Sequence, residues 1–469
     1  MAKPADIETP HGALAKLWTL ADGDPAALAS VALTGSEPVL PSSFCVGTAA
    51  QISIAAAALA SAELWKLRGG ETQTVSCGMR AAAAEFRSER YFRIDGEPPP
   101  PPWDKIAGVY RTGDGRWLRL HTNFPHHRDG VLDILGCAYE RDAVGTALEN
   151  WSASDFEDAA AERGLVVAMM RSFDEWDAHP QGRAVAALPL LEIIRIGDAE
   201  PRPLPAGERP LSGIRVLNLT RVIAGPVCGR TLAAHGADVM RVTSPELPHI
   251  PGLIADMGRG KLSAFIDLQT KEGCATLRGL AGTSDVFVQG YRPGGIAGLG
   301  FSPQEVAGMR PGIIYVSLSA YGHEGPWSDR RGFDSLVQMA TGINHGEAEA
   351  AGADGPEALP CQALDHATGH LMACGVMTAL HRRATQGGSW LVRGSLAQTG
   401  HWLRQMGRVE GGQARADPGP DAVGDLVELA PSGFGALAAV RHAAQMPATP
   451  PRWTRPSVPL GTHPPVWPN

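Results

Sequence analysis

The chain has 469 residues, of which 44% are hydrophobic and 19% charged, and its formal net charge is −8. This length suffices for two or three compact domains, because one hydrophobic core rarely serves more than about 250 to 300 residues. The negative charge, without clustered Lys and Arg, argues against nucleic-acid binding, which requires cations to neutralise phosphates.

Seven cysteines stand far apart with no CxxC pair, so the sequence predicts neither a bound metal nor a disulfide framework. The first residues contain no uninterrupted apolar stretch, and the most apolar run, residues 52–60, is too short to span a membrane. We therefore expect a soluble, cytoplasmic protein that contacts neither membrane nor nucleic acid.

An alanine-rich stretch, residues 47–68, has the composition of a helix and is followed by a Gly pair and a strand-like piece. The same order recurs near the other end of the chain, where residues 365–396 resemble residues 47–79. We interpret this as an internal repeat, with two unrelated alanine-rich helices as the alternative. Gly47 or Thr48 stands in the first copy at the place of Asp365, so that copy would carry no matching carboxylate.

Five consecutive prolines, residues 98–102, predict a stiff extended connector. Beyond them, residues 106–122 alternate as two short strands around a turn, and helical stretches follow before the apolar run 166–170. This pattern predicts a small α+β domain over residues 103–200. A polar stretch rich in proline, residues 199–209, is a second linker.

From Leu211 onward, apolar strands alternate with helical stretches. We expect strands at residues 214–219, 238–242, 263–268, 285–289 and 313–317, and helices at 227–234, 271–280 and 302–309. Such alternation buries a parallel sheet between helices and places ligands outside the carboxyl ends of the strands. The expected fold class is therefore α/β, with a Rossmann-like parallel sheet, although no GxGxxG motif opens its first helix.

One carboxylate, Asp365, precedes an apolar segment with helical spacing over residues 369–383. The stretch before it, residues 345–355, is acidic and glycine-rich, and we expect no regular structure there. An Asp in front of a helix commonly caps it by accepting from the free N–H groups of the first turn. The same position would also expose a nucleophilic carboxylate whose ionised form the helix end favours. The residues by themselves leave both interpretations open.

Five motifs follow one another in the second half of the chain. They are IRVLNLTRVIAGP from residue 214, GRGKLSAFIDLQTKEG from 258, FVQGYRPGGIAGLGF from 287, GPWSDRRGFDSL from 325 and LDHATG from 364. In this order they resemble the amino-terminal half of the class III CoA-transferases, a family that includes formyl-CoA transferase, carnitine CoA-transferase and 2-methylacyl-CoA racemases. The residues before the second linker resemble the later half of the same family.

This resemblance implies a chain order that is permuted or partly duplicated relative to the family. Residues 1–97 would be a helical segment resembling the post-catalytic region, and residues 103–200 the small α+β domain that forms a lid. Residues 211–400 would be the Rossmann-like CoA-binding and catalytic domain. Residues 401–469 would be a carboxyl-terminal extension that returns to the large domain.

The family places its nucleophilic aspartate in an Asp-x-x-x-Gly context before a helix, so the resemblance assigns this role to Asp365. It implies transfer of CoA from an acyl-CoA to a carboxylic acid through an aspartyl-CoA thioester. Coenzyme A would enter only as part of the acyl-CoA substrate, with no permanently bound cofactor and no metal. The resemblance also implies a homodimer.

Further matched positions imply contacts with CoA or support for the site. The CoA contacts would be Arg221, Val222, Ile223, Ala224, Lys261, Tyr291, Arg292 and Arg331. The supporting residues would be Asp334, which either orients the site or caps a helix, and Gly369. Without the family, Lys261 and Arg292 are ordinary surface cations and Tyr291 a packed ring.

Some positions depart from the family pattern. Phe333 stands where the racemases have a His, which removes one of the two bases that racemisation needs. Gly258 and Gly298, together with Thr243 or Ser244, replace polar or basic family residues. The alternatives to a transferase are therefore a degenerate acyl-CoA-binding protein and an acyl-CoA isomerase. In an isomerase, His366 or His323 would have to supply the second base.

Overall fold

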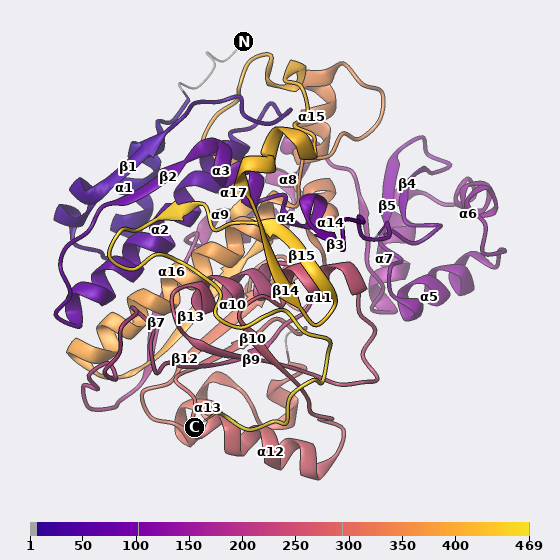
Figure 1. The fold of residues 1–469 in the computed structure, drawn as a ribbon. Coiled ribbons are helices and arrows are strands. Elements are labelled where there is room, and N and C mark those ends of the chain that lie inside the picture. The colour runs from indigo at the N-terminus through magenta and orange to yellow at the C-terminus, as the bar shows by residue number, and fades with distance from the viewer. Residues whose placement is uncertain (1–6, 102, 293, 469) are drawn as a thin grey trace.

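The largest element of the fold is a seven-stranded sheet with the strand order β10-β9-β8-β11-β12-β13-β7. The computed structural model describes residues 7–101, 103–292 and 294–468 (Figure 1). Strands β10 to β13 of this order are parallel, and β7 pairs antiparallel with β13 at one edge. The strands are β7 (Glu192–Gly197), β8 (Arg215–Leu219), β9 (Asp238–Thr243), β10 (Lys261–Phe265), β11 (Val286–Gln289), β12 (Ile314–Ser319) and β13 (Ser389–Ser395). The predicted α/β fold class is thereby confirmed.

Helices cover both faces of this sheet. The helices of this part of the chain are α10 (Ala224–Ala234), α11 (Pro251–Met257), α12 (Lys271–Ala281), α13 (Pro303–Met309), α14 (Asp334–Ala340), α15 (Ile343–Ala351), α16 (Ala363–Gln386) and α17 (Leu396–Gln405), of which α15 packs against α14 and α8 (Phe173–Ala178) rather than against the sheet. Successive residues of a strand point to opposite faces. Val216 of β8 accordingly joins a core with Leu232 of α10, whereas Leu217 joins a core with Leu277 of α12.

Two expectations about local structure need correction. Residues 345–355, expected to be irregular, lie largely in α15. Its buried Glu347 accepts hydrogen bonds from the Ser43 backbone N–H (3.0 Å) and side-chain hydroxyl (2.8 Å), so contacts distant in sequence hold this helix. Helix α16 begins at Ala363, six residues before the predicted start, so Asp365 lies inside its first turn.

The amino-terminal region contains a helix that packs along α16. Its elements are α1 (Pro10–Leu20), η1 (Pro25–Ser30), β1 (Val31–Thr34), α2 (Val46–Leu67), β2 (Val75–Gly78), α3 (Met79–Glu85), α4 (Ser88–Tyr91) and β3 (Arg93–Ile94). Helix α2 is long and apolar enough to cross a membrane, but most of it is buried inside the protein. Its run of fully buried alanines, residues 55–58, lets α16 approach closely.

The two repeat segments adopt the same order of helix, strand and helix. In the first copy this order is α2, β2 and α3; in the second it is α16, β13 and α17. β2 pairs parallel with β1 and antiparallel with β16 (Ala444–Gln445), as β13 pairs parallel with β12 and antiparallel with β7. Each copy therefore receives its antiparallel strand from a segment distant in sequence, which ties the two halves of the chain together.

A small α+β unit lies to one side of the large sheet, at the right of Figure 1. Its elements are β4 (Gly108–Arg111), β5 (Trp117–Leu120), α5 (Pro125–Leu135), α6 (Arg141–Leu148), α7 (Ala153–Glu162) and β6 (Val167–Met169), and its core is separate. Helices α8 (Phe173–Ala178) and α9 (Pro180–Ala187) lead back to β7. The proline run before this unit is described up to Pro101; residue 102 lies outside the described residues.

The carboxyl-terminal residues return to both parts of the molecule. They form η3 (Gly412–Ala414), η4 (Pro420–Leu426), β14 (Val427–Ser432), β15 (Gly435–Val440) and β16. β15 pairs antiparallel with β3 of the amino-terminal region. Farther on, the His463 N–H donates to the Ser263 carbonyl on β10 at 2.8 Å, so this segment covers the edge of the large sheet.

Candidate active site

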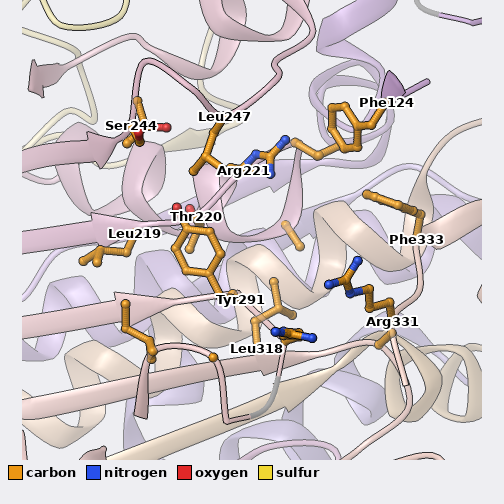
Figure 2. A pocket seen from close by; sticks show the side chains of 18 of the residues that line it. Phe124, Leu219, Thr220, Arg221, Ser244, Leu247, Tyr291, Leu318, Arg331 and Phe333 are labelled. Carbon is orange, nitrogen blue, oxygen red and sulfur yellow. The ribbon is translucent and has the colours of Figure 1, made fainter. Parts of the chain in front are cut away.

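A cavity of about 640 Å³ opens at the carboxyl ends of the parallel strands (Figure 2). Its walls come from the ends of β8, β9, β11 and β12, from the segment after β10, and from the small α+β unit. The lining includes Leu219, Thr220, Val242, Ile266, Gly290 and Leu318. This is the edge at which parallel α/β sheets bind ligands, as the sequence predicts.

The loop between β8 and α10 forms one wall of the cavity and contributes Arg221, Val222, Ile223 and Ala224. Val222 has a φ of 70°, which a β-branched residue rarely adopts. Such backbone strain costs on the order of 1 to 3 kcal/mol and persists only where the surroundings impose it. The turn brings the beginning of α10 to the cavity, where the Ala224 backbone N–H faces the Asp365 carboxylate and lowers its pKa, against the effect of burial.

Asp365 reaches the cavity from the first turn of α16. Only 7% of the residue is exposed. Gly369, one turn farther along α16, lies so close to α10 that an added Cβ would be 2.6 Å from the Ala224 carbonyl oxygen. The glycine therefore permits the close helix crossing that brings Asp365 to the beginning of α10.

Asp334 supplies the cap that the sequence attributed, in one interpretation, to Asp365. Its Oδ2 accepts from the backbone N–H groups of Leu364 (2.9 Å) and Asp365 (3.0 Å), and its Oδ1 accepts from the Gln338 side chain. The residue before α16, Gln362, makes no side-chain cap. Asp334 thus caps α16 from a different helix, and the Asp365 side chain remains available to the cavity.

Burial raises the pKa of Asp365 well above its usual value, and the nearby carboxylates of Asp334 and Glu89 raise it further. Burial also raises the pKa of Asp334 to about 6, against the hydrogen bonds that Asp334 accepts. A carboxylate with a raised pKa is more basic, and hence a stronger nucleophile, whenever it is ionised.

The predicted CoA contacts other than Lys261 line the cavity together. The guanidinium carbon of Arg221 lies 4.6 Å from the centroid of the Phe124 ring (Figure 2). Arg331 donates to the Gly164 carbonyl at 3.1 Å. Tyr291 and Arg292 directly follow the end of β11 and also line the cavity. The guanidinium groups of Arg221, Arg292 and Arg331, together with that of Arg330, line this cavity and suit a ligand that carries phosphates.

Lys261 does not line this cavity. The side chain is fully buried at the beginning of β10, and its Nζ donates to the Pro226 carbonyl at 2.7 Å. The prediction that Lys261 contacts the CoA phosphates does not fit this position. The motif identified the residue correctly as part of the large domain, but the strand carries it to the end of the sheet away from the cavity.

The small α+β unit adds cavity residues that the sequence did not indicate, namely Phe124, His126 and His127. Burial lowers the pKa of His127 to about 3, so the ring is neutral at physiological pH. Phe333, the residue before α14, stacks on His121 with the ring centroids 4.0 Å apart, which joins this unit to the beginning of α14. The only signal for them in the sequence is the pair of adjacent histidines, residues 126 and 127, a few residues after the second predicted strand.

The remaining histidine candidates take other positions. His366 is fully buried and its Nε2 lies 3.0 Å from Glu89 Oε2. His323 lies 3.3 Å from Glu192 and is not part of the cavity lining. Within residues 7–101, 103–292 and 294–468, no group of three or more His, Cys, Asp and Glu side chains could hold a metal ion.

These features define an α/β protein with one buried carboxylate in a cavity edged by arginines. Comparison with known families identifies the class: the chain belongs to CoA-transferase family III, whose model matches residues 211–455. The resemblance seen in the sequence motifs is thereby confirmed.

Among individual proteins, the chain is similar to the acetyl-coenzyme A transferase nodX of Hypoxylon pulicicidum, with 31% identity over 330 residues, or 65% of this chain and 55% of that protein. It is 36% identical over 158 residues to the succinate–glutarate CoA-transferase of Agrobacterium fabrum, covering 30% of this chain and 40% of that one. A solved structure of a hypothetical protein from Mycobacterium tuberculosis matches with 32% identity and a TM-score of 0.39, covering 43% of this chain and 59% of that one. The chain spans about half the length of the curated relatives it matches.

Proposed function

We propose that this protein is a CoA-transferase that moves CoA from an acyl-CoA to a carboxylic acid through a thioester on Asp365. The observation that carries the proposal is the buried Asp365 carboxylate at the wall of a cavity that Arg221, Arg292 and Arg331 also line. The arginines would bind the CoA phosphates, and the pantetheine arm would bring the thioester to Asp365.

In this mechanism, a carboxylate oxygen of Asp365 attacks the thioester carbonyl, and the C–S bond breaks to give an acyl-aspartyl anhydride and the CoA thiolate. The thiolate then attacks the Asp365 carbonyl carbon and releases the donor acid, which leaves an aspartyl-CoA thioester. The acceptor carboxylate attacks this thioester to form a second anhydride and free the thiolate. Thiolate attack on the acceptor carbonyl yields the new acyl-CoA and restores Asp365.

The surroundings of Asp365 suit such intermediates. Anhydrides hydrolyse readily, so the site must exclude water. Asp365 is 7% exposed, and Phe124 and His127 of the small unit, which also line the cavity, are buried as well. The Ala224 N–H at the beginning of α10 is positioned to stabilise negative charge on the reacting carboxyl group.

We also propose that the reaction takes place in the cytoplasm, which the unpaired state of all seven cysteines supports. The resemblance implies a homodimer. Because the described residues of one chain supply both the Asp365 wall and the small-unit wall of the cavity, we propose that a dimer joins through other surfaces.

The test is peptide mass spectrometry after the protein is mixed with a panel of acyl-CoAs and trapped with hydroxylamine. We expect a modified peptide containing Asp365, and none in Asp365→Asn. The matched control is Asp198→Asn, because the Asp198 side chain, directly after the edge strand β7, is 99% exposed. CoA binding without modification of Asp365 would instead indicate an acyl-CoA-binding protein. Incorporation of solvent deuterium next to the thioester, without acceptor acid, would indicate an isomerase.

A further inference from the structure

The amino-terminal region places a second carboxylate beside the catalytic helix. Glu89 lies on the short helix α4, which follows α3 in the first repeat copy. Its Oε2 is 3.0 Å from Nε2 of His366, the residue directly after Asp365 on α16. The two groups are 277 residues apart in sequence, so only the tertiary structure brings them together.

This pair is enclosed by protein. His366 is fully buried and its ring stacks on Phe86, with the centroids 5.3 Å apart. The Nδ1 of His366 and the Oε1 of Glu89 are also buried, and neither has a hydrogen-bond partner among the described residues. Breaking the contact between His366 Nε2 and Glu89 Oε2 would leave these two atoms unpaired as well. Unpaired polar groups in a buried place are costly, so the contact holds both side chains in place.

Other charged and titratable groups surround the pair from each neighbouring element. Asp334 of α14 and Asp256 of α11 each interact electrostatically with His366, as does His370 one turn farther on α16. Arg87, Arg90 and Cys361 lie around the same place from the α4 side and the segment before α16. Asp256 is already paired with Arg230 (2.9 Å) and Arg259 (2.8 Å). Glu89 is therefore the carboxylate that contacts His366 directly.

We infer that Glu89 is a positioning residue for Asp365: it anchors the neighbouring His366 on α16 and places a further negative charge near the nucleophile. The inference rests on the proposed function. Anchoring His366 holds the first turn of α16, and with it the direction in which Asp365 enters the cavity. The negative charge of Glu89 contributes to the raised pKa of Asp365 and so keeps the ionised carboxylate strongly basic.

The test compares the pH dependence of Asp365 modification by an acyl-CoA in wild type, Glu89→Gln and Glu89→Asp. Glu89→Gln keeps a hydrogen bond to His366 but removes the charge, so the pH midpoint for modification should shift downward and the rate at high pH should fall several-fold. Glu89→Asp keeps the charge but shortens the side chain, so the midpoint should stay while the rate falls. Thermal unfolding of each variant verifies that it is folded.

The matched control is Glu349→Gln. Glu349 also pairs with a histidine, His345, at 3.4 Å, but on the exposed side of α15. Glu349→Gln should leave both the pH midpoint and the rate of Asp365 modification unchanged. If wild type is modified at Asp365 and Glu89→Gln shows the wild-type midpoint, the inference is wrong while the proposed function stands. If wild type shows no modification at all, the proposed function fails first.

Discussion

Asp365 combines an unfavourable environment for charge with a proposed role, that of the nucleophile, which requires charge. The residue is buried beside Asp334 and Glu89, which raises its pKa, while a single backbone N–H of Ala224 favours its ionised form. A structural cap would not need this arrangement, because Asp334 already accepts the N–H groups at the beginning of α16. Groups held at such a cost are typical of functional sites.

Replacing Asp365 by Asn should therefore stabilise the protein at neutral pH. Because the folded-state pKa is raised, the folded protein binds the proton more tightly than the unfolded chain, and each tenfold in that affinity is worth about 1.4 kcal/mol. Stability from this group is fully present below the unfolded pKa of about 3.9 and is lost as pH rises through the folded pKa. We expect Asp365→Asn to melt above wild type at pH 8 and close to it at pH 4. Equal melting temperatures at pH 8 would contradict the raised pKa.

Arg331 provides a test of the cavity opening. Its guanidinium lines the cavity and bonds the Gly164 carbonyl. Removing it by Arg331→Ala should weaken CoA binding by about 1.4 kcal/mol, roughly tenfold in Kd, with less effect at high salt. Isothermal titration with CoA measures this. The control is Arg163→Ala. Arg163 directly precedes Gly164, is exposed and pairs with Asp133, so this variant should bind CoA as wild type does.

At the scale of elements, the crossing of α16 over α10 decides where Asp365 lies. A Cβ on Gly369 would meet both the Ala224 carbonyl oxygen (2.6 Å) and the Val227 Cβ (2.7 Å). Backbone and a packed side chain cannot move aside easily, so the helices would have to separate. The separation would also draw Asp365 away from the Ala224 N–H.

Gly369→Ala should accordingly destabilise the protein by about 1 to 3 kcal/mol, as overpacking does, and reduce the rate of Asp365 modification. Urea unfolding and trapping by hydroxylamine measure the two effects. The control is Gly279→Ala on α12, where an added Cβ meets nothing within 4 Å. That change should stabilise by about 0.5 to 1 kcal/mol, because alanine favours a helix over glycine. A stabilised Gly369→Ala would show that the crossing is looser than the structure indicates.

The elements also show why local sequence signals reached only part of the site. The alternation from Leu211 onward correctly predicts a parallel sheet, since each strand is a short apolar run bounded by turn residues. Most of α15 was misjudged because its Gly346 and acidic residues resemble a loop, whereas burial of Glu347 against Ser43 stabilises a helix. Lys261 was misplaced because a motif does not indicate which end of a strand faces a ligand.

At the scale of the whole molecule, the cavity is shared between the halves of the chain. The small unit contributes Phe124 and His127, the large sheet contributes Tyr291, and α16 contributes Asp365. Strand β7, from the first half of the chain, pairs with β13 of the second repeat copy, and β16, from near the carboxyl terminus, pairs with β2 of the first copy. These two pairings fix the relative position of the two halves. Binding of an acyl-CoA in the cavity should therefore protect backbone amides in both halves of the chain.

Hydrogen exchange measured by mass spectrometry tests this expectation. A saturating acyl-CoA should slow amide exchange at the start of α5, where His126 and His127 line the cavity, as well as in the segment of residues 290–292. Helix α6, which belongs to the same unit but does not line the cavity, should exchange as before. Protection confined to the large domain would show that the small unit does not close on the ligand.

The sequence by itself determined the family, the α/β class and the identity of Asp365 as the candidate nucleophile, because these depend on ordered motifs and on periodicities that local residues carry. Only the tertiary structure decided which carboxylate caps α16, which cations reach the cavity, and that Glu89 contacts His366. Those facts depend on contacts between residues tens to hundreds of positions apart. Packing creates such contacts, and no local pattern in this chain encodes them.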